Sequence, residues 1–242
     1  MKLKYITISG TNEYTSVEDL AVLLFKHPLA EAGIQVSGEK CSYNSSRLEW
    51  ILSLYRFLNK NKMRVNVALH INKDWVEKFC AGEVVPELQD LLNLRYYNGD
   101  KFIKRVQLNF KIGREKTPDL KILHKMILQY CDHRFILSYN ESNAELINHL
   151  YKAGVIFDNL FDSSFGKGIE PSNRESPVFN GILQGYAGGL GPDNISKEIQ
   201  RLKSIDADIY IDAQKKLEDE NEHLDLHKAE IFINNTLKAI RC

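Results

Sequence analysis

The chain has 242 residues, of which 43% are hydrophobic, so it is long enough to form one sizeable core. Its 32 lysines and arginines balance its 32 aspartates and glutamates, and this neutrality disfavours nucleic acid or an anionic membrane surface as a partner. No segment approaches the roughly 20 apolar residues that cross a bilayer, and the first ten residues lack the features of a signal peptide.

Strand-like and helix-like segments alternate along the whole chain. We expect strands at 4–9, 33–36, 64–71, 102–109, 134–138, 155–161, 181–184 and 208–211. We expect amphipathic helices at 16–24, 47–58, 75–94 (interrupted at Gly82 and Pro86), 120–130, 144–152, 195–202 and 228–237. Such alternation is typical of βαβ units and a parallel sheet. Eight units in this length predict an α/β fold, a single-domain (β/α)₈ TIM barrel over residues 1–242, with an open doubly wound sheet as the alternative.

The stretch 185–202, GYAGGLGPDNISKEIQRL, carries the strongest functional motif of the chain. Gly188 and Gly189 remove side chains where a ligand would touch the backbone, while Pro192 and Asn194 are start signals for a helix. Backbone N–H groups at a helix start attract anions, and the helix dipole adds to this attraction. The motif is therefore either a phosphate cradle or an ordinary strand-to-helix turn, because short glycine motifs are common in loops.

In a TIM barrel the active face is formed by the C-terminal ends of the strands and by the loops that follow them. Polar or charged candidates at these places are Thr7, Ser9, Arg47, His70, Asn72, Gln107, Asn109, Asp162, Asp212, Lys215 and Lys216. We expect His70 to pack or hydrogen-bond within the barrel, since no partner His or carboxylate stands at metal-ligand spacing. The sequence predicts no metal site.

Several short motifs at these strand ends follow one another in a known order. They are TISG at 7–10, SSR at 45–47, LHIN at 69–72, VQLN at 106–109, Asp162 followed by SSFGKG, and YAGGLGPDN at 186–194. With these motifs the chain resembles the phosphoribosylanthranilate isomerase family over nearly its whole length. The resemblance implies an Amadori rearrangement of a phosphorylated aminoaldose to an aminoketose, of the tryptophan-biosynthesis type and without a cofactor. In this reaction an acid protonates the ring oxygen and a base removes the C2 proton.

The resemblance also implies roles for individual residues. By position, Asp162 would be the general acid and Arg47 would hold a substrate carboxylate, for which its forked donors are suited. Gly188, Gly189 and the helix start at Asn194 would hold the phosphate. The remaining strand-end side chains would bind substrate: Asn72, Gln107 and Asn109, the last standing where the family has a histidine. Asp162 could instead be a plain turn residue, and Arg47 a solvated charge on the first turn of a helix.

Two departures from the family pattern bear on activity. The family's general base is a cysteine and Ser9 stands in its place, although an alcohol is far less acidic than a thiol with a pKa near ~8.5. Asp212 ends the last strand, beside the first strand of a closed barrel, and is the candidate replacement base; Cys41 is a second candidate. The family's serine-serine-glycine turn after the eighth strand is AQKK here, and Lys215 or Lys216 could replace the lost phosphate contact.

The leading hypothesis is therefore an intramolecular oxidoreductase, an aldose–ketose isomerase that binds a phosphorylated sugar and acts as a monomer or homodimer. The alternatives are another phosphosugar isomerase or epimerase, and a non-catalytic phosphosugar-binding barrel that lost its base. The four cysteines, Cys41, Cys80, Cys131 and Cys242, are far apart in sequence, which favours reduced thiols in a cytoplasmic protein.

Overall fold

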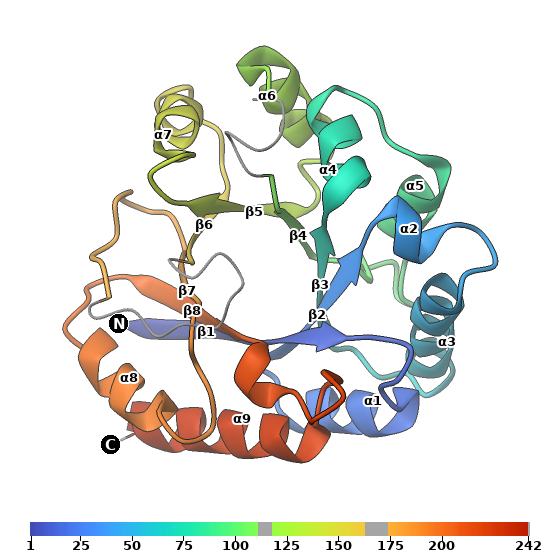
Figure 1. Ribbon diagram of the computed structural model, residues 1–242, viewed down its shortest axis with the longest axis vertical. Coiled ribbons are helices and arrows are strands. Elements are labelled where there is room, and N and C mark those ends of the chain that lie inside the picture. Colours follow the sequence, from blue (N-terminus) through green and yellow to red (C-terminus); the bar gives the residue numbers. More distant parts are fainter. Residues whose placement is uncertain (111–117, 163–173, 242) are drawn as a thin grey trace.

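A computed structural model describes residues 1–110, 118–162 and 174–241 of the chain. Eight strands follow one another in chain order around a closed, all-parallel barrel (Figure 1). The strands are β1 (Lys2–Thr11), β2 (Ala30–Val36), β3 (Asn66–Ile71), β4 (Arg105–Leu108), β5 (Arg134–Tyr139), β6 (Asp158–Phe161), β7 (Gln184–Tyr186) and β8 (Asp208–Ala213). The predicted (β/α)₈ barrel is confirmed.

Helices surround the barrel on its outside, as Figure 1 shows. They are α1 (Val17–Lys26), α2 (Gly38–Cys41), α3 (Ser46–Lys60), α4 (Lys73–Cys80), α5 (Pro86–Asn93), α6 (Leu120–Gln129), α7 (Ala144–Lys152), α8 (Ile195–Leu202) and α9 (Leu226–Arg241), with a short 3₁₀ segment η1 (Lys215–Leu217). Within the described ranges, no helix combines the length and the apolar character that crossing a membrane would require.

Local chemistry fixes several of these helix ends. The Ser16 side chain accepts a hydrogen bond from the Asp19 N–H, so α1 begins at the predicted cap. Gly82 has φ +91°, in the left-handed region that favours glycine, and Pro86 is the first residue of α5. The helical stretch predicted over 75–94 is therefore divided into α4 and α5 at the two expected breakers.

The seventh strand was predicted too early, at 181–184, whereas β7 spans Gln184–Tyr186. Gly181 has φ +72° and still belongs to a turn, and pairing with β6 begins only at Gln184. Gly185 has to be a glycine because an added Cβ would lie 2.1 Å from the ring Cζ of Tyr210. A three-residue strand that contains such a glycine has no apolar periodicity by which the sequence could locate it.

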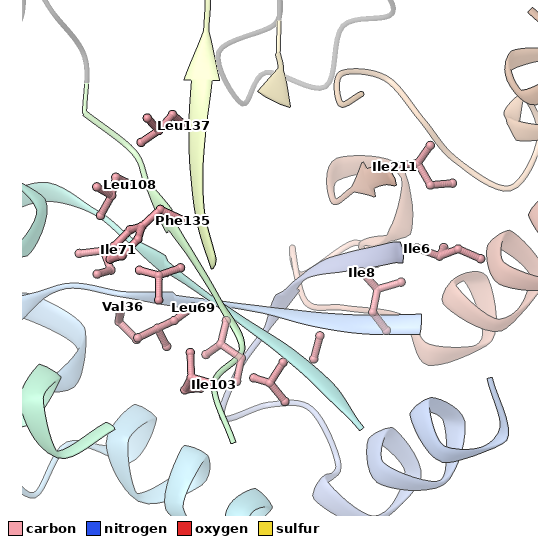
Figure 2. Close-up of a cluster of buried hydrophobic side chains, with 14 of the residues drawn as sticks. Ile6, Ile8, Val36, Leu69, Ile71, Ile103, Leu108, Phe135, Leu137 and Ile211 are labelled. Atoms are coloured by element: carbon pink, nitrogen blue, oxygen red, sulfur yellow. The ribbon is translucent and has the colours of Figure 1, made fainter. Parts of the chain in front are cut away.

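A continuous apolar core fills the space between the outer surface of the barrel and the helices. Figure 2 shows part of this core, with Ile6 and Ile8 of β1, Leu69 and Ile71 of β3, and Leu108 of β4. Because side chains alternate along a strand, the residues between them face the barrel interior. The interior side chains then determine what lies beneath the C-terminal ends of the strands.

A buried ionic group occupies part of this interior. The Arg105 guanidinium, whose side chain is 1% exposed, donates hydrogen bonds to Glu31 Oε1 at 2.7 Å and to Asp158 Oδ2 at 3.0 Å. It also lies over the rings of Tyr5 and Tyr210, at 4.5 and 4.1 Å from their centroids. These contacts connect β1, β2, β4, β6 and β8 across the barrel.

We predict that Arg105→Met destabilises the protein by about 3–5 kcal/mol, because Glu31 would stay buried without its ion pair and Asp158 would keep only its ion pair with Arg134. Urea denaturation would measure this loss. Arg56→Met is the matched control: it breaks an ion pair with Glu49 whose side chains are 60% and 61% exposed, and it should change stability by less than about 1 kcal/mol. Equal effects of the two substitutions would contradict a structural role for the interior group.

Candidate functional site

A cavity of about 280 Å³ opens at the C-terminal ends of the strands. It brings together most of the site residues predicted from the sequence: Ser9, Asn72, Gln107, Asn109, Asp162, Gly188, Gly189, Asp212 and Lys215. Asp162 and the glycine pair therefore lie on one cavity, as the barrel hypothesis required. Arg47 and Asn194 are not among its lining residues. The SSFGKG segment that follows Asp162 lies outside the described residues.

Ser9 and Asp212 form a buried pair where the barrel closes. Strand β1 runs beside β8, with Thr7 in register with Asp212, and Ser9 Oγ donates a hydrogen bond to Asp212 Oδ1 at 2.6 Å. The pKa of Asp212 is raised to about 7. Burial is the largest cause, the negative charges of Asp162 and Glu31 also raise the pKa, and the hydrogen bond from Ser9 lowers it. A carboxyl group with this pKa can gain or lose a proton near neutral pH, as acid–base catalysis requires.

Glycine at position 33 makes room for this part of the site. A Cβ added to Gly33 would lie 2.5 Å from Ser9 Oγ and 2.9 Å from the His70 ring Cε1. No other residue type would leave the space in which Ser9 and His70 lie beside β2. Gly33 was not among the predicted site residues, because the predicted strand 33–36 begins at it; in the structure Gly33 lies inside β2, where a glycine often marks a close approach.

The glycine turn after β7 has the backbone conformation that glycine favours. Gly188 has φ +84° and Gly189 has φ +65°. Arg174 donates hydrogen bonds to the carbonyl oxygens of Ala187 at 2.5 Å and Gly188 at 3.0 Å. In a trans peptide the N–H points opposite to the C=O, so the N–H groups of Gly188 and Gly189 point away from Arg174. This leaves two neighbouring donors on a turn that lines the cavity.

Arg174 is itself fixed by a buried ion pair. Its Nε donates to Glu198 Oε2 at 2.8 Å, and the Glu198 side chain on α8 is fully buried. The sequence analysis missed both residues, because neither stands at a strand end. The available signal was a glutamate at position 198, on the apolar face formed by Ile195, Ile199 and Leu202.

Asn194 holds the same turn from the side of the helix. Its Nδ2 donates to the Gly189 carbonyl at 2.8 Å, and its Oδ1 accepts from the Gly191 N–H at 2.9 Å. Both polar atoms of the Asn194 side chain are thus used to hold the turn. A phosphate contact at the start of α8 stays a prediction.

Lysines after β8 lie close to this turn. Lys215 Nζ forms ion pairs with Glu218 at 3.0 Å and Glu222 at 2.6 Å, and its side chain is 43% exposed. A Cβ added to Gly191 would lie 2.5 Å from the Cβ of Lys216, so the Lys216 stem packs on the turn backbone. Both lysines line the cavity and place positive charge on its β8 side.

Arg47 lies behind the cavity wall. Its guanidinium pairs with the carboxylate of Glu13, and Nη1 donates to the carbonyl oxygen of Gln35 at 2.9 Å. Gln35 itself lines the cavity. The other candidate base, Cys41, is buried and does not line the cavity, and burial raises the pKa of its thiol to about 11. The thiol of Cys41 therefore stays protonated at neutral pH.

Metal binding was not predicted from the sequence. Among the residues that the structure describes, no three His, Cys, Asp or Glu side chains are grouped as metal ligands.

No protein-family model matches the chain, and no curated protein sequence does. Solved structures match over nearly the whole chain. TrpF from Jonesia denitrificans has a TM-score of 0.59 at 13% identity, over 98% of both chains. The chain shares its fold with phosphoribosylanthranilate isomerases.

Two further solved structures show how widely this fold is shared. Phosphoribosyl anthranilate isomerase from Thermus thermophilus gives a TM-score of 0.59 at 14% identity, over 98% of this chain and 99% of that one. The 3-hexulose-6-phosphate synthase from Salmonella typhimurium gives 0.50 at 10% identity, over 99% and 100%. The resemblance to the isomerases in the sequence motifs thus extends to the arrangement of the whole barrel.

We predict that Arg174→Met speeds amide hydrogen exchange in residues 186–191 by about tenfold or more, because the turn loses the donor that orients two of its carbonyls. Exchange followed by mass spectrometry would measure this. Arg201→Met is the matched control, since Arg201 pairs with the same Glu198 at 2.6 Å but stands in the last turn of α8. Exchange that speeds equally in both variants would assign the effect to Glu198 alone.

We predict that the stability of Asp212→Asn relative to the wild type rises with pH. The pKa of Asp212 is about 7 in the folded protein and about 3.9 in an unfolded chain. The native state therefore holds the proton more tightly, and wild-type stability is lost as pH rises from about 4 through about 7. Urea denaturation at about pH 4 and about pH 8 should show a relative gain for the variant on the order of 3 kcal/mol. A difference independent of pH would contradict the raised pKa.

Proposed function

We propose that this protein is an aldose–ketose isomerase that carries out an Amadori-type rearrangement of a phosphorylated aminoaldose. One arrangement carries the proposal. The buried Ser9–Asp212 pair and Asp162 line the same cavity as the glycine turn. A proton acceptor, a second carboxyl group and an anion-binding turn are the parts that this reaction needs.

The reaction can be assigned to these groups step by step. Asp162 gives a proton to the ring oxygen, the bond from that oxygen to C1 breaks, and the nitrogen lone pair forms a C1 iminium. Asp212 then takes the proton from C2, and the C2–H electron pair forms a C1–C2 double bond while the iminium nitrogen becomes neutral. The resulting enol takes a proton at C1 from Asp212 and gives its hydroxyl proton to Asp162, which forms the C2 ketone and returns both carboxyl groups to their starting states. Oxidation at C2 and reduction at C1 balance within the substrate.

Asp212 takes the part that a cysteine has in the resembling family. Its pKa of about 7 makes the carboxylate available at neutral pH and still basic enough to accept a proton. Ser9 serves as a hydrogen-bond donor that fixes Asp212 Oδ1, which leaves the second carboxylate oxygen for the substrate. The Ser9 hydroxyl is thereby a positioning group and not the base.

The phosphate is assigned to the glycine turn. The Gly188 and Gly189 N–H groups and the two cavity lysines offer donors and positive charge on the β7–β8 side of the cavity. A similar barrel, a phosphoribosyl anthranilate isomerase of 17% identity and TM-score 0.56, was solved with reduced 1-(o-carboxyphenylamino)-1-deoxyribulose 5-phosphate, a phosphorylated ligand of the class proposed here. The sequence motifs imply phosphoribosylanthranilate isomerase activity, whereas the proposal drawn from the site is the reaction type, an Amadori rearrangement of a phosphorylated aminoaldose.

We predict that Asp212→Asn lowers turnover by about 10³-fold or more. The substrates are the N-glycosides of ribose 5-phosphate with 2-aminobenzoate and with 2-aminobenzamide, and loss of the C2 proton signal in deuterium oxide reports the step directly. In the wild type, the rate of C2 proton loss from bound substrate should rise about tenfold per pH unit below pH ~7 and then level, as Asp212 loses its proton.

Ser9→Ala separates positioning from catalysis in the same assay. The hydrogen bond from Ser9 lowers the pKa of Asp212, so this variant should keep measurable turnover while its pH profile moves to higher pH. Retained turnover in Asp212→Asn would remove Asp212 as the base. A folded wild-type protein that binds ribose 5-phosphate but exchanges no C2 proton would favour the non-catalytic barrel.

A further inference from the structure

The cavity wall across the barrel from the glycine turn consists of uncharged polar groups. Strands β2 to β5 lie opposite β7 and β8 (Figure 1). Their ends and the loops after them contribute amide and imidazole side chains to the cavity: Gln35, His70, Asn72, Gln107, Asn109 and Asn140. Among the described lining residues, positive charge is confined to Lys215 and Lys216 on the β8 side.

Hydrogen bonds fix the orientation of these amides. Gln107 Nε2 donates to Asn109 Oδ1 at 2.7 Å, Asn109 Nδ2 donates to Asn72 Oδ1 at 2.9 Å, and Asn72 Nδ2 donates to the His70 carbonyl at 2.8 Å. Asn109 and Asn72 each use both the oxygen and the nitrogen of their amides in this chain of bonds, whereas Gln107 uses its nitrogen alone. The chain of bonds sets Gln107 with its amide nitrogen engaged and its oxygen available.

Two buried polar atoms in this wall have no hydrogen-bond partner among the residues that the structure describes. They are Gln107 Oε1 and His70 Nε2, on side chains that are 6% and 3% exposed and that line the cavity. A buried polar atom without a partner costs about 1–3 kcal/mol, so it calls for a ligand or water. Burial and the nearby Arg105 lower the pKa of His70 to about 3, so its imidazole is neutral. The wall therefore offers a neutral acceptor and a neutral imidazole nitrogen.

A carboxylate would be poorly held at this wall. The arginine behind it, Arg47, is already engaged by Glu13 and by the Gln35 carbonyl. Asp162 and Asp212 line the same cavity, and a third acidic group would add like charge to it. A carboxylate stripped of water without a cation costs several kcal/mol.

We propose that the group linked to the substrate nitrogen is uncharged and hydrogen-bonding, of carboxamide or hydroxyl chemistry, and that Gln107 and His70 bind it. This inference rests on the proposed function, which places the substrate phosphate at the glycine turn. The group linked to the substrate nitrogen then extends from the glycine turn to the opposite wall. A neutral group there separates this protein from enzymes whose substrate carries an aryl carboxylate.

The test compares two ligands that differ only in charge: 1-(2-carbamoylphenylamino)-1-deoxyribulose 5-phosphate and its 2-carboxyphenyl counterpart. Isothermal titration calorimetry at about pH 8 should give a Kd for the carboxamide about tenfold or more below that for the carboxylate. Gln107→Leu and His70→Phe should each reduce this preference to within about threefold. Gln200→Leu, which changes an exposed amide on α8, is the matched control and should leave both Kd values unchanged.

A gain-of-function variant tests the role of Arg47. Glu13→Gln releases Arg47 from its ion pair. This variant should bind the carboxylate ligand more tightly and so reduce the ratio of the two Kd values. Carboxylate binding as tight as carboxamide binding in the wild type, a preference unchanged in both wall variants, or no binding of either ligand would overturn the inference. Because binding is measured without turnover, a carboxamide preference with no C2 exchange would refute the isomerase alone. Turnover that favours the carboxylate would refute the inference alone.

Discussion

The hydrogen bond between Ser9 and Asp212 exists only because the sheet closes on itself. The two residues are 203 positions apart, and they meet where β1 pairs with β8. Closure also removes Asp212 from water, and this burial is the largest cause of its raised pKa. An open sheet made from the same strands would leave Asp212 on an edge, exposed and with an ordinary acidity. The acid–base property of the site is therefore a consequence of barrel topology.

The buried group around Arg105 acts on the cavity above it. Its positive charge lowers the pKa of Asp212 and that of His70, while the Glu31 carboxylate raises the pKa of Asp212. These charges act together with burial, which is the largest cause in both groups and which brings the pKa of Asp212 to about 7 and leaves His70 uncharged. Charges inside the barrel thus influence the pKa values of cavity residues through space. A purely apolar interior could pack equally well but would lack this electrostatic effect.

The sequence was sufficient for the fold and for much of the site because both follow from local rules. Eight alternating units predict the barrel, and the strand-end rule selected Asp162, Asp212 and the glycine pair. It could not show that Arg174 holds the glycine turn, because that contact depends on how a loop folds back over β7. It could not show either that Glu13 engages Arg47, since the loop after β1 and the start of α3 meet only in the folded chain, 34 positions apart.

The buried arginines clarify how charge is distributed in this molecule. Arg47, Arg105 and Arg174 each pair with a glutamate, Glu13, Glu31 and Glu198 respectively. Arg47 and Arg174 also donate to backbone carbonyls beside the cavity, so their donors orient the protein and are occupied before any ligand arrives. Within the described lining, positive charge lies on Lys215 and Lys216 beside the glycine turn, and Lys215 is itself paired with the exposed Glu222 and with Glu218. A ligand charged at one end and neutral at the other matches this distribution, because its neutral end needs no counterion from the arginines that the protein has already engaged.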